Sequence, residues 1–313
     1  MKCISVNIIL LAILLSMQSC IRDDRFDCKN SALRLGFQYT LNNQYTDLFG
    51  SEVARVTAYV FDTNNKYVGT YTESGDNLRN KYIMTIPLPE GRYHAVVFCD
   101  NLNTFTTGGI DSGTNLSDFR IILNSVETSD GYLTPRTVPG DLFAGYVSDV
   151  PTTYDESYTT IVDLMKDTKN VKVKITGLNY ITRSVITPEI YVTAVNGKYM
   201  SDNSIDTSHR MLKYIPHQTS VTENTMEADL RTMRLVVGHA PMLVIKNPVT
   251  SGYLLNEDIT KLILSNPKYT SQKDIDREDT FVFEINFNQV DNNVVISILI
   301  NGWKVNEITP VND

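Results

Sequence analysis

Residues 54–71 read ARVTAYVFDTNNKYVGTY and contain a complete strand–turn–strand pattern. From Ala54 to Val60, small or apolar residues alternate with Arg55, Thr57 and Tyr59, which is the period of a half-buried strand. The polar run 62–65, Asp-Thr-Asn-Asn, favours a turn, and 67–71 returns as a second strand. The segment therefore predicts a β-hairpin.

The same period of two recurs on both sides of this hairpin. Further strands are predicted at 33–39, 82–86, 92–99, 119–123 and 158–164, and then at 171–175, 190–194, 235–237, 242–245, 281–287 and 294–300. Short strands separated by turns favour an all-β protein built as β-sandwiches. The length fits two tandem domains, with bounds at 31–166 and 167–313.

Several local patterns give expectations that a structure can test. Residues 100–118 and 125–155 are polar and are expected to be surface loops, and 254–264 has the apolar spacing of one helix. Asn196-Gly197 is a hairpin signal. The strand 294–300 is apolar enough to be covered on both faces, and Trp303 is expected at a core strand end.

The N-terminus predicts export. Residues 1–19 combine Lys2, an apolar run and a small residue at Ser19, as in a secretory signal peptide. Cys20 follows directly and resembles the acylated cysteine of a bacterial lipoprotein. Met17 departs from the lipoprotein box, the short motif before that cysteine, in which a Leu-type residue is more usual at this position. Residues 20–30 would then be a lipidated tether. The alternative is an ordinary signal peptide with a chance cysteine.

The tether carries the charged residues Arg22, Asp23 and Asp24. They resemble the acidic export tag of surface lipoproteins in Bacteroidetes, and a plain solvated linker is the alternative. Cys28 and Cys99 are the remaining cysteines of the mature chain. In an oxidising compartment they can form one disulfide, or Cys99 can be a buried free thiol.

Composition and motifs argue against several classes of function. After loss of Lys2 the mature chain keeps 27 basic and 36 acidic residues, a net charge of −9, which does not suit nucleic acid. The four histidines are scattered, and no hydrolase, nucleotide-binding or metalloprotease motif occurs. The acidic run 274–279 lacks EF-hand spacing and is expected to be a solvated loop with Arg277 paired locally. No catalytic residue, metal site or cofactor is predicted.

An ordered set of short motifs resembles the FimB/Mfa2 family of fimbrial anchor and minor-fimbrium lipoproteins of Bacteroidales. Beyond Cys20 and Cys28, the motifs are Asp47-Leu48-Phe49, the strand 53–62, Glu90-Gly91-Arg92-Tyr93, Asp141-Leu142-Phe143-Ala144-Gly145, 276–281 and Ile300-Asn301-Gly302-Trp303. Phe98-Cys99 departs from the family pattern, in which a non-cysteine residue is expected. The resemblance implies two transthyretin-like, Greek-key β-sandwich domains and no enzymatic activity.

The resemblance also implies partners and a location. Fimbrillin shaft subunits would bind the protein, and lipid on Cys20 would hold it at the outer face of the cell outer membrane. Residues 304–313, interrupted by Pro310, leave little to donate, so this subunit is expected to receive a strand. The alternative function is a surface glycan-binding lipoprotein of a polysaccharide uptake system. Glycan sites usually need exposed aromatic rings, so a single tryptophan, Trp303, argues against this alternative, whereas the 17 tyrosines are compatible with it.

Overall fold

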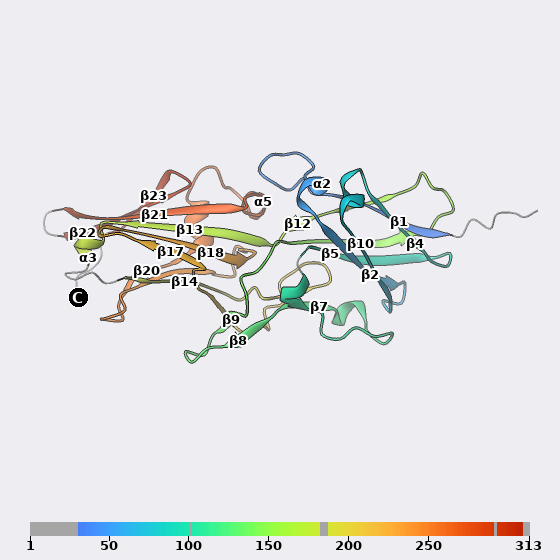
Figure 1. Ribbon diagram of the computed structural model, residues 1–313, viewed down its shortest axis with the longest axis horizontal. Helices are drawn as coiled ribbons and strands as arrows, with labels where there is room; N and C mark the ends of the chain where they lie inside the picture. Colours follow the sequence, from blue (N-terminus) through green and yellow to red (C-terminus); the bar gives the residue numbers. More distant parts are fainter. Residues whose placement is uncertain (1–30, 101, 182–186, 291–292, 309–313) are drawn as a thin grey trace, which may run out of the picture.

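The computed structural model describes residues 31–100, 102–181, 187–290 and 293–308. The signal peptide, Cys20, the residues 22–24 and Cys28 lie outside these ranges. The described chain is built almost entirely of strands, with two sandwich units placed end to end along the long axis (Figure 1). The prediction of an all-β protein is confirmed.

The hairpin of residues 54–71 forms as expected. Strand β2 (Arg55–Asp62) pairs antiparallel with β3 (Tyr67–Ser74). The Asp62 carboxylate accepts hydrogen bonds from the backbone N–H groups of Asn64 and Lys66, and Asn65 has a φ of 61°. Asparagine tolerates this left-handed conformation better than most residues, which explains the turn.

Two sheets form the first sandwich. The smaller has the order β11 (Thr160–Asp163), β1 (Ala32–Gln38) and β4 (Ile83–Pro87). The larger has the order β12 (Met165–Lys166), β10 (Leu142–Pro151), β5 (Arg92–Asp100), β2 and β3. Leu33, Leu35 and Phe37 of β1 lie in the core between them.

A third layer covers the other face of the larger sheet. It consists of β6 (Phe105–Thr106), β7 (Arg120–Leu123) and β15 (Lys198–Met200), preceded by the 3-10 turns η2 (Leu102–Thr104) and η3 (Leu116–Asp118). Strand β5 is therefore buried on both faces. Val97 and Cys99 face the first core, whereas Val96 and Phe98 pack with Phe119 in the second.

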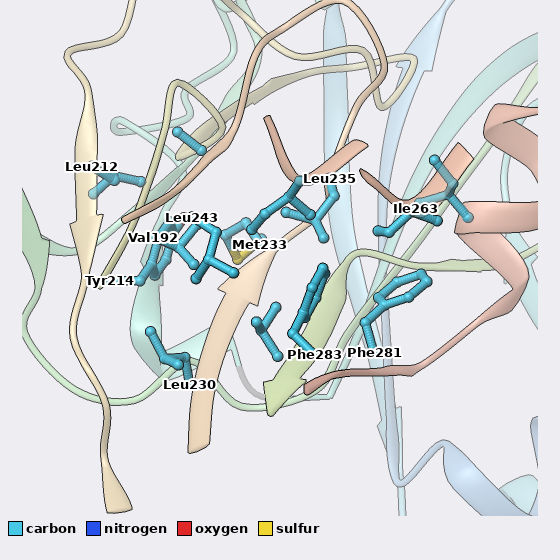
Figure 2. Packing of buried hydrophobic residues seen from close by; sticks show 14 of the residues in the cluster. Val192, Leu212, Tyr214, Leu230, Met233, Leu235, Leu243, Ile263, Phe281 and Phe283 are labelled. Atoms are coloured by element: carbon cyan, nitrogen blue, oxygen red, sulfur yellow. The ribbon is translucent and has the colours of Figure 1, made fainter. Parts of the chain in front are cut away.

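The second sandwich packs two six-stranded sheets. One has the order β17 (Gln218–Val221), β18 (Thr225–Met233), β13 (Thr168–Thr176), β21 (Thr280–Val290), β22 (Asn293–Ile300) and β23 (Trp303–Ile308). The other has the order β20 (Tyr253–Asp258), β19 (Met242–Lys246), β14 (Glu189–Ala194), β16 (Leu212–Tyr214), β9 (Leu133–Pro135) and β8 (Ser125–Glu127). Figure 2 shows the core side chains of both sheets, among them Val192, Tyr214, Leu243, Leu230, Phe281 and Phe283.

Short helices complete the chain. They are α2 (Phe49–Glu52), the 3-10 turn η1 (Asp76–Arg79), α3 (Leu178–Ile181), α4 (Ile259–Leu264) and α5 (Gln272–Arg277). The prediction of one helix over 254–264 is wrong for its first half. Residues 253–258 pair with β19 as β20, and Asp258 then caps α4 by accepting from the N–H groups of Thr260 and Lys261. Pairing with a neighbouring strand overrides the helical spacing here.

Three further expectations are wrong, because the pairing of strands far apart in the sequence differs from what the local patterns indicate. The interval 125–155, expected to be loop, contains β8, β9 and the ten-residue strand β10. Asn196-Gly197 does not close a hairpin, since β14 pairs with β16 and β19 whereas β15 pairs with β7. Trp303 is 54% exposed.

Strand β22 is second from the edge, and only one of its faces is fully buried. Ile296, Ile298 and Ile300 lie in the core. Val295 and Leu299, on the other face, are half-buried. The expectation of complete coverage is therefore only half correct.

The two units exchange strands across residue 166. Strands β8 and β9 precede this boundary but extend a sheet of the second sandwich, where β9 pairs parallel with β16. In return β15, from the second half, pairs antiparallel with β7. One hydrophobic cluster accordingly contains residues of both halves, such as Phe98 and Phe283.

Candidate functional site

The segment 274–279, expected to be a solvated loop, is built into the junction between the two units. Residues 272–277 form α5, and the Asp276 side chain at its end is only 5% exposed. The Arg234 guanidinium donates to both carboxylate oxygens of Asp276, at 2.8 and 2.7 Å. The Lys169 ammonium donates to the backbone oxygen of Asp276 at 2.7 Å. This prediction was wrong because Arg234, directly after β18, and Lys169 of β13 bind Asp276 away from solvent.

Asp167 lies in the same buried cluster and is fully enclosed. Burial raises its pKa to about 7, and the nearby Arg234 cation opposes this rise. Burial likewise lowers the pKa of Lys169 to about 8, against the pull of the carboxylates around it. The Asn203 amide donates to Asp167 Oδ1 at 3.1 Å. The start of β13 is thus a charged, desolvated element of the core.

Lys166 joins three carboxylates at the same junction. Its ammonium lies 3.0 Å from Asp279, 3.4 Å from Glu52 and 3.4 Å from Asp141. Burial lowers the pKa of Lys166, but these carboxylates outweigh burial and leave the pKa above its ordinary value. Arg231 of β18 also pairs with Asp141. Lys166 and Asp141 come from the first half of the chain and Asp279 from the second.

A loop of the first unit contacts the end of α5. The Arg277 guanidinium donates to the backbone oxygens of Thr40 and Asn42 at 3.3 Å each, and it lies 4.6 Å from the centre of the Tyr45 ring. The Asn43 amide donates to Glu278 at 3.1 Å. Together with the exchanged strands, these contacts join the two units to each other.

The edge strands of a sheet carry unpaired backbone N–H and C=O groups, so another chain can add a strand there. In the described ranges, β3 and β12 end the larger sheet of the first unit, and β17 and β23 end one sheet of the second. Strand β3 spans eight residues with alternating exposure, and Val68 on it is 41% exposed.

The C-terminal strand β23 pairs with β22 from Trp303 to Ile308. The end of the described chain is therefore already part of its own sheet. Residues 309–313 lie outside the described ranges.

A groove of about 510 Å³ lies beside β1, between the start of β4 and α2. Phe37, Phe49, Tyr82, Ile83 and Ile161 supply its apolar lining. Gly36 lies in its floor, where an added Cβ would be 2.7 Å from Ile161 Cδ1.

The described residues contain no group of three or more His, Cys, Asp or Glu side chains that fits a metal ion. Cys99 is fully buried, and burial raises the pKa of its thiol. Its pairing with Cys28 stays a prediction, since Cys28 is outside the described residues.

Sequence reasoning missed the junction residues Lys166, Lys169 and Arg234. The sequence places the boundary between the two units within the polar run 166–170, yet Lys166 and Lys169 are 7% and 0% exposed. The sequence signal that could have indicated these residues is the charged run 166–169, which directly precedes the strongly alternating strand 171–175.

Comparison with known proteins gives one family. The model of the fimbrillin-A associated anchor proteins Mfa1 and Mfa2 matches residues 24–309. No curated protein sequence matches the chain.

Three solved structures share the fold. The fimbrial anchor protein Mfa2 from Porphyromonas gingivalis is 20% identical, with a TM-score of 0.71 over 88% of this chain and 99% of that one. A candidate adhesin from Bacteroides thetaiotaomicron is 24% identical, with a TM-score of 0.71 over 88% and 97%. A candidate polysaccharide-binding protein from the same species is 23% identical, with a TM-score of 0.70 over 87% and 96%.

Proposed function

The chain belongs to the family of fimbrillin-A associated anchor proteins, and we propose that it anchors a fimbrium to the cell surface. The observation that carries this proposal is the family match over residues 24–309, which includes both sandwich units. We take 31–166 and 167–313 as the two units, with the exchanged strands linking them. The role is structural and requires no catalytic group.

We further propose that residues 1–19 are removed and that Cys20 is acylated. Residues 20–30 then form the tether, and Arg22, Asp23 and Asp24 direct the protein to the outer face of the outer membrane. Several acyl chains on one cysteine give persistent attachment, at about 0.8 kcal/mol for each buried CH₂. Within the described ranges, no helix is long and apolar enough to cross a membrane.

The partner in this proposal is a fimbrillin shaft subunit that adds a strand to a free sheet edge. Backbone hydrogen bonds give such an addition its affinity, and side-chain pockets give it specificity. The pairing of β23 with β22 supports a receiving role, because the last described strand is not available for donation. Replacing residues 308–313 by an unrelated polar tail is expected to leave fimbrial attachment intact.

Acylation is tested by metabolic labelling with a palmitate analogue in the native host. We expect label on the wild type and on Cys28→Ser, and none on Cys20→Ser. Cells carrying Cys20→Ser should shed fimbriae into the medium, while Cys28→Ser cells keep them. Equal labelling or equal retention in the two variants would contradict the membrane attachment.

Strand addition is tested by photo-crosslinking on intact cells. A crosslinking amino acid is placed at Val68 on β3, at Val221 on β17 or at Trp303 on β23, which are 41%, 43% and 54% exposed. We expect one of the three positions to give a fimbrillin adduct, identified by mass spectrometry. Adducts at none of them would refute strand addition at these edges.

Exposed aromatic rings favour glycan binding as the second candidate. Trp303 is 54% exposed and Tyr253 is 61% exposed, so both rings are available to stack on sugars. Retention of purified protein on polysaccharide beads, lost in Trp303→Ala or Tyr253→Ala, would support this candidate. Co-purification of fimbrillin without retention on beads would favour the anchor.

A further inference from the structure

Strand β1 is the first element after the tether, and it lies in the middle of its sheet. It pairs antiparallel with β4 from Ala32 to Gly36 and parallel with β11 from Leu35 to Gln38. Both of its edges are therefore hydrogen-bonded. A central strand loses two ladders when it is pulled out, whereas an edge strand loses one.

The parallel pairing fixes the direction in which these ladders would be loaded. From the C-terminal end of β11 the chain continues through β12 into β13 of the second unit. Tension between the tether and the second unit pulls β1 toward its start and β11 toward its end. The two strands run side by side in the same direction, so this tension slides them past each other. Shear of this kind loads the hydrogen bonds of a ladder together, whereas unzipping breaks them one at a time.

Contacts at both ends of β1 resist such sliding. At the start, Ala32 and Thr153 exchange two backbone hydrogen bonds of 3.0 Å, and the Ser31 hydroxyl donates to the backbone oxygen of Leu88 at 2.6 Å. At the end, the Leu164 N–H donates to the Gln38 backbone oxygen at 2.8 Å. The Gln38 side-chain amide also donates to the Asp163 carboxylate.

Side chains lock the strand on both faces. Leu33, Leu35 and Phe37 are at most 7% exposed in the first core. On the opposite face, the Ile161 side chain lies directly over Gly36, within 2.7 Å of where a Cβ would be. Moving β1 along its axis would drag three apolar side chains through a close-packed core.

We propose that β1, held between β4 and β11, is a mechanical clamp that keeps the tether attached to the folded protein under tension. This inference rests on the proposed function, in which the tether is fixed in the membrane and a shaft pulls on the second unit. The clamp requires no partner. It is a property of the topology and is measurable on the isolated protein.

The test is single-molecule pulling on residues 20–313 with Cys20 and Cys28 replaced by serine. One handle is attached at Val249→Cys, a 70% exposed position in the second unit. The other is attached either at the N-terminus, which loads β1, or at Tyr154→Cys, a 51% exposed position ahead of β11. In the second geometry the load enters β11 through the covalent chain and bypasses the β1 ladders.

Two substitutions weaken the clamp. Gln38→Ala removes one side-chain hydrogen bond to β11, and Phe37→Leu shortens a buried side chain of β1. With the N-terminal handle we expect Gln38→Ala to shorten the lifetime of the first unit at fixed force about fivefold, the factor given by about 1 kcal/mol for one hydrogen bond. We expect Phe37→Leu to shorten the same lifetime because it removes apolar contacts from the core. With the Tyr154 handle we expect no change. Gln218→Ala, on the exposed strand β17, is the control and should leave both lifetimes unchanged.

The outcomes separate the clamp from the proposed function. Unchanged lifetimes with the N-terminal handle, or equal shortening through both handles, would overturn the clamp while leaving acylation and fimbrial attachment untouched. If Cys20→Ser cells keep their fimbriae while the direction-dependent shortening is seen, the clamp is a property of the fold and the membrane role is wrong.

Discussion

Replacing Asp276 by asparagine tests whether the buried charges at the junction stabilise the fold. The carboxylate accepts two bonds from Arg234 and one of 2.9 Å from Gln272, and its side chain is 5% exposed. An amide of the same shape removes the charge and leaves the Arg234 and Lys169 cations desolvated. Removing one partner of a buried pair costs about 3–5 kcal/mol. At about 2–4 °C for each kcal/mol, the midpoint of thermal unfolding should fall by about 6–20 °C.

The assays are thermal unfolding and urea unfolding, both followed by circular dichroism, with Glu227→Gln as the matched control. Glu227 of β18 pairs with Lys174 of β13, but the two side chains are 56% and 46% exposed. Exposed ion pairs contribute about 0–1 kcal/mol, so the control substitution should change the free energy of unfolding very little. If Asp276→Asn loses no more free energy of unfolding than Glu227→Gln, the junction charges do not stabilise the fold as argued.

Three further predictions concern single positions. Burial raises the pKa of Asp167 from its ordinary value of 3.8 to about 7, so between these pH values the folded state holds a proton that the unfolded chain releases. The stability of the wild type relative to Asp167→Asn should thus fall as pH rises from 4 to 7, by at most about 1.4 kcal/mol per pH unit, and a flat difference in urea titrations would contradict this. Gly177→Ala should destabilise far more than Gly75→Ala in thermal melts, since both have positive φ but only Gly177 would place a Cβ against the backbone oxygen of Phe287. In thiol titration of a protein carrying Cys20→Ser and Cys28→Ser, Cys99 should react only after unfolding, because its side chain is fully buried, and reaction in the native state would contradict this.

The strands that alternate cleanly were predictable from local sequence. Residues 67–71 and 171–175 have a more buried and a more exposed side, and the period of two reports this directly. Strand β2 was also found from its period of two, although the structure buries it on both faces. Strand β10 was missed because Pro135, Pro139 and Pro151 surround it and made its interval look like loop. Strand β20 was missed because Leu254 to Leu264 has helical spacing, and only the free edge of β19 made a strand more stable there.

The candidate site was much less predictable than the strands. Whether a charged residue is solvated or buried depends on what the rest of the chain places against it. Asp276 and its cation Arg234 are 42 residues apart, and Lys169 is 107 residues from Asp276. No local period connects such positions, so the acidic run 274–279 looked like an ordinary surface loop.

The sequence by itself determined the fold class and the family, because side-chain alternation and the order of short motifs are properties of the chain alone. The tertiary structure decided which strands are neighbours. It placed β8 and β9 in the second sandwich, gave β1 a partner on each edge and buried Lys166 and Lys169 among carboxylates. These outcomes depend on long-range pairing, in which the free energy of burying a face is shared between segments far apart in the sequence.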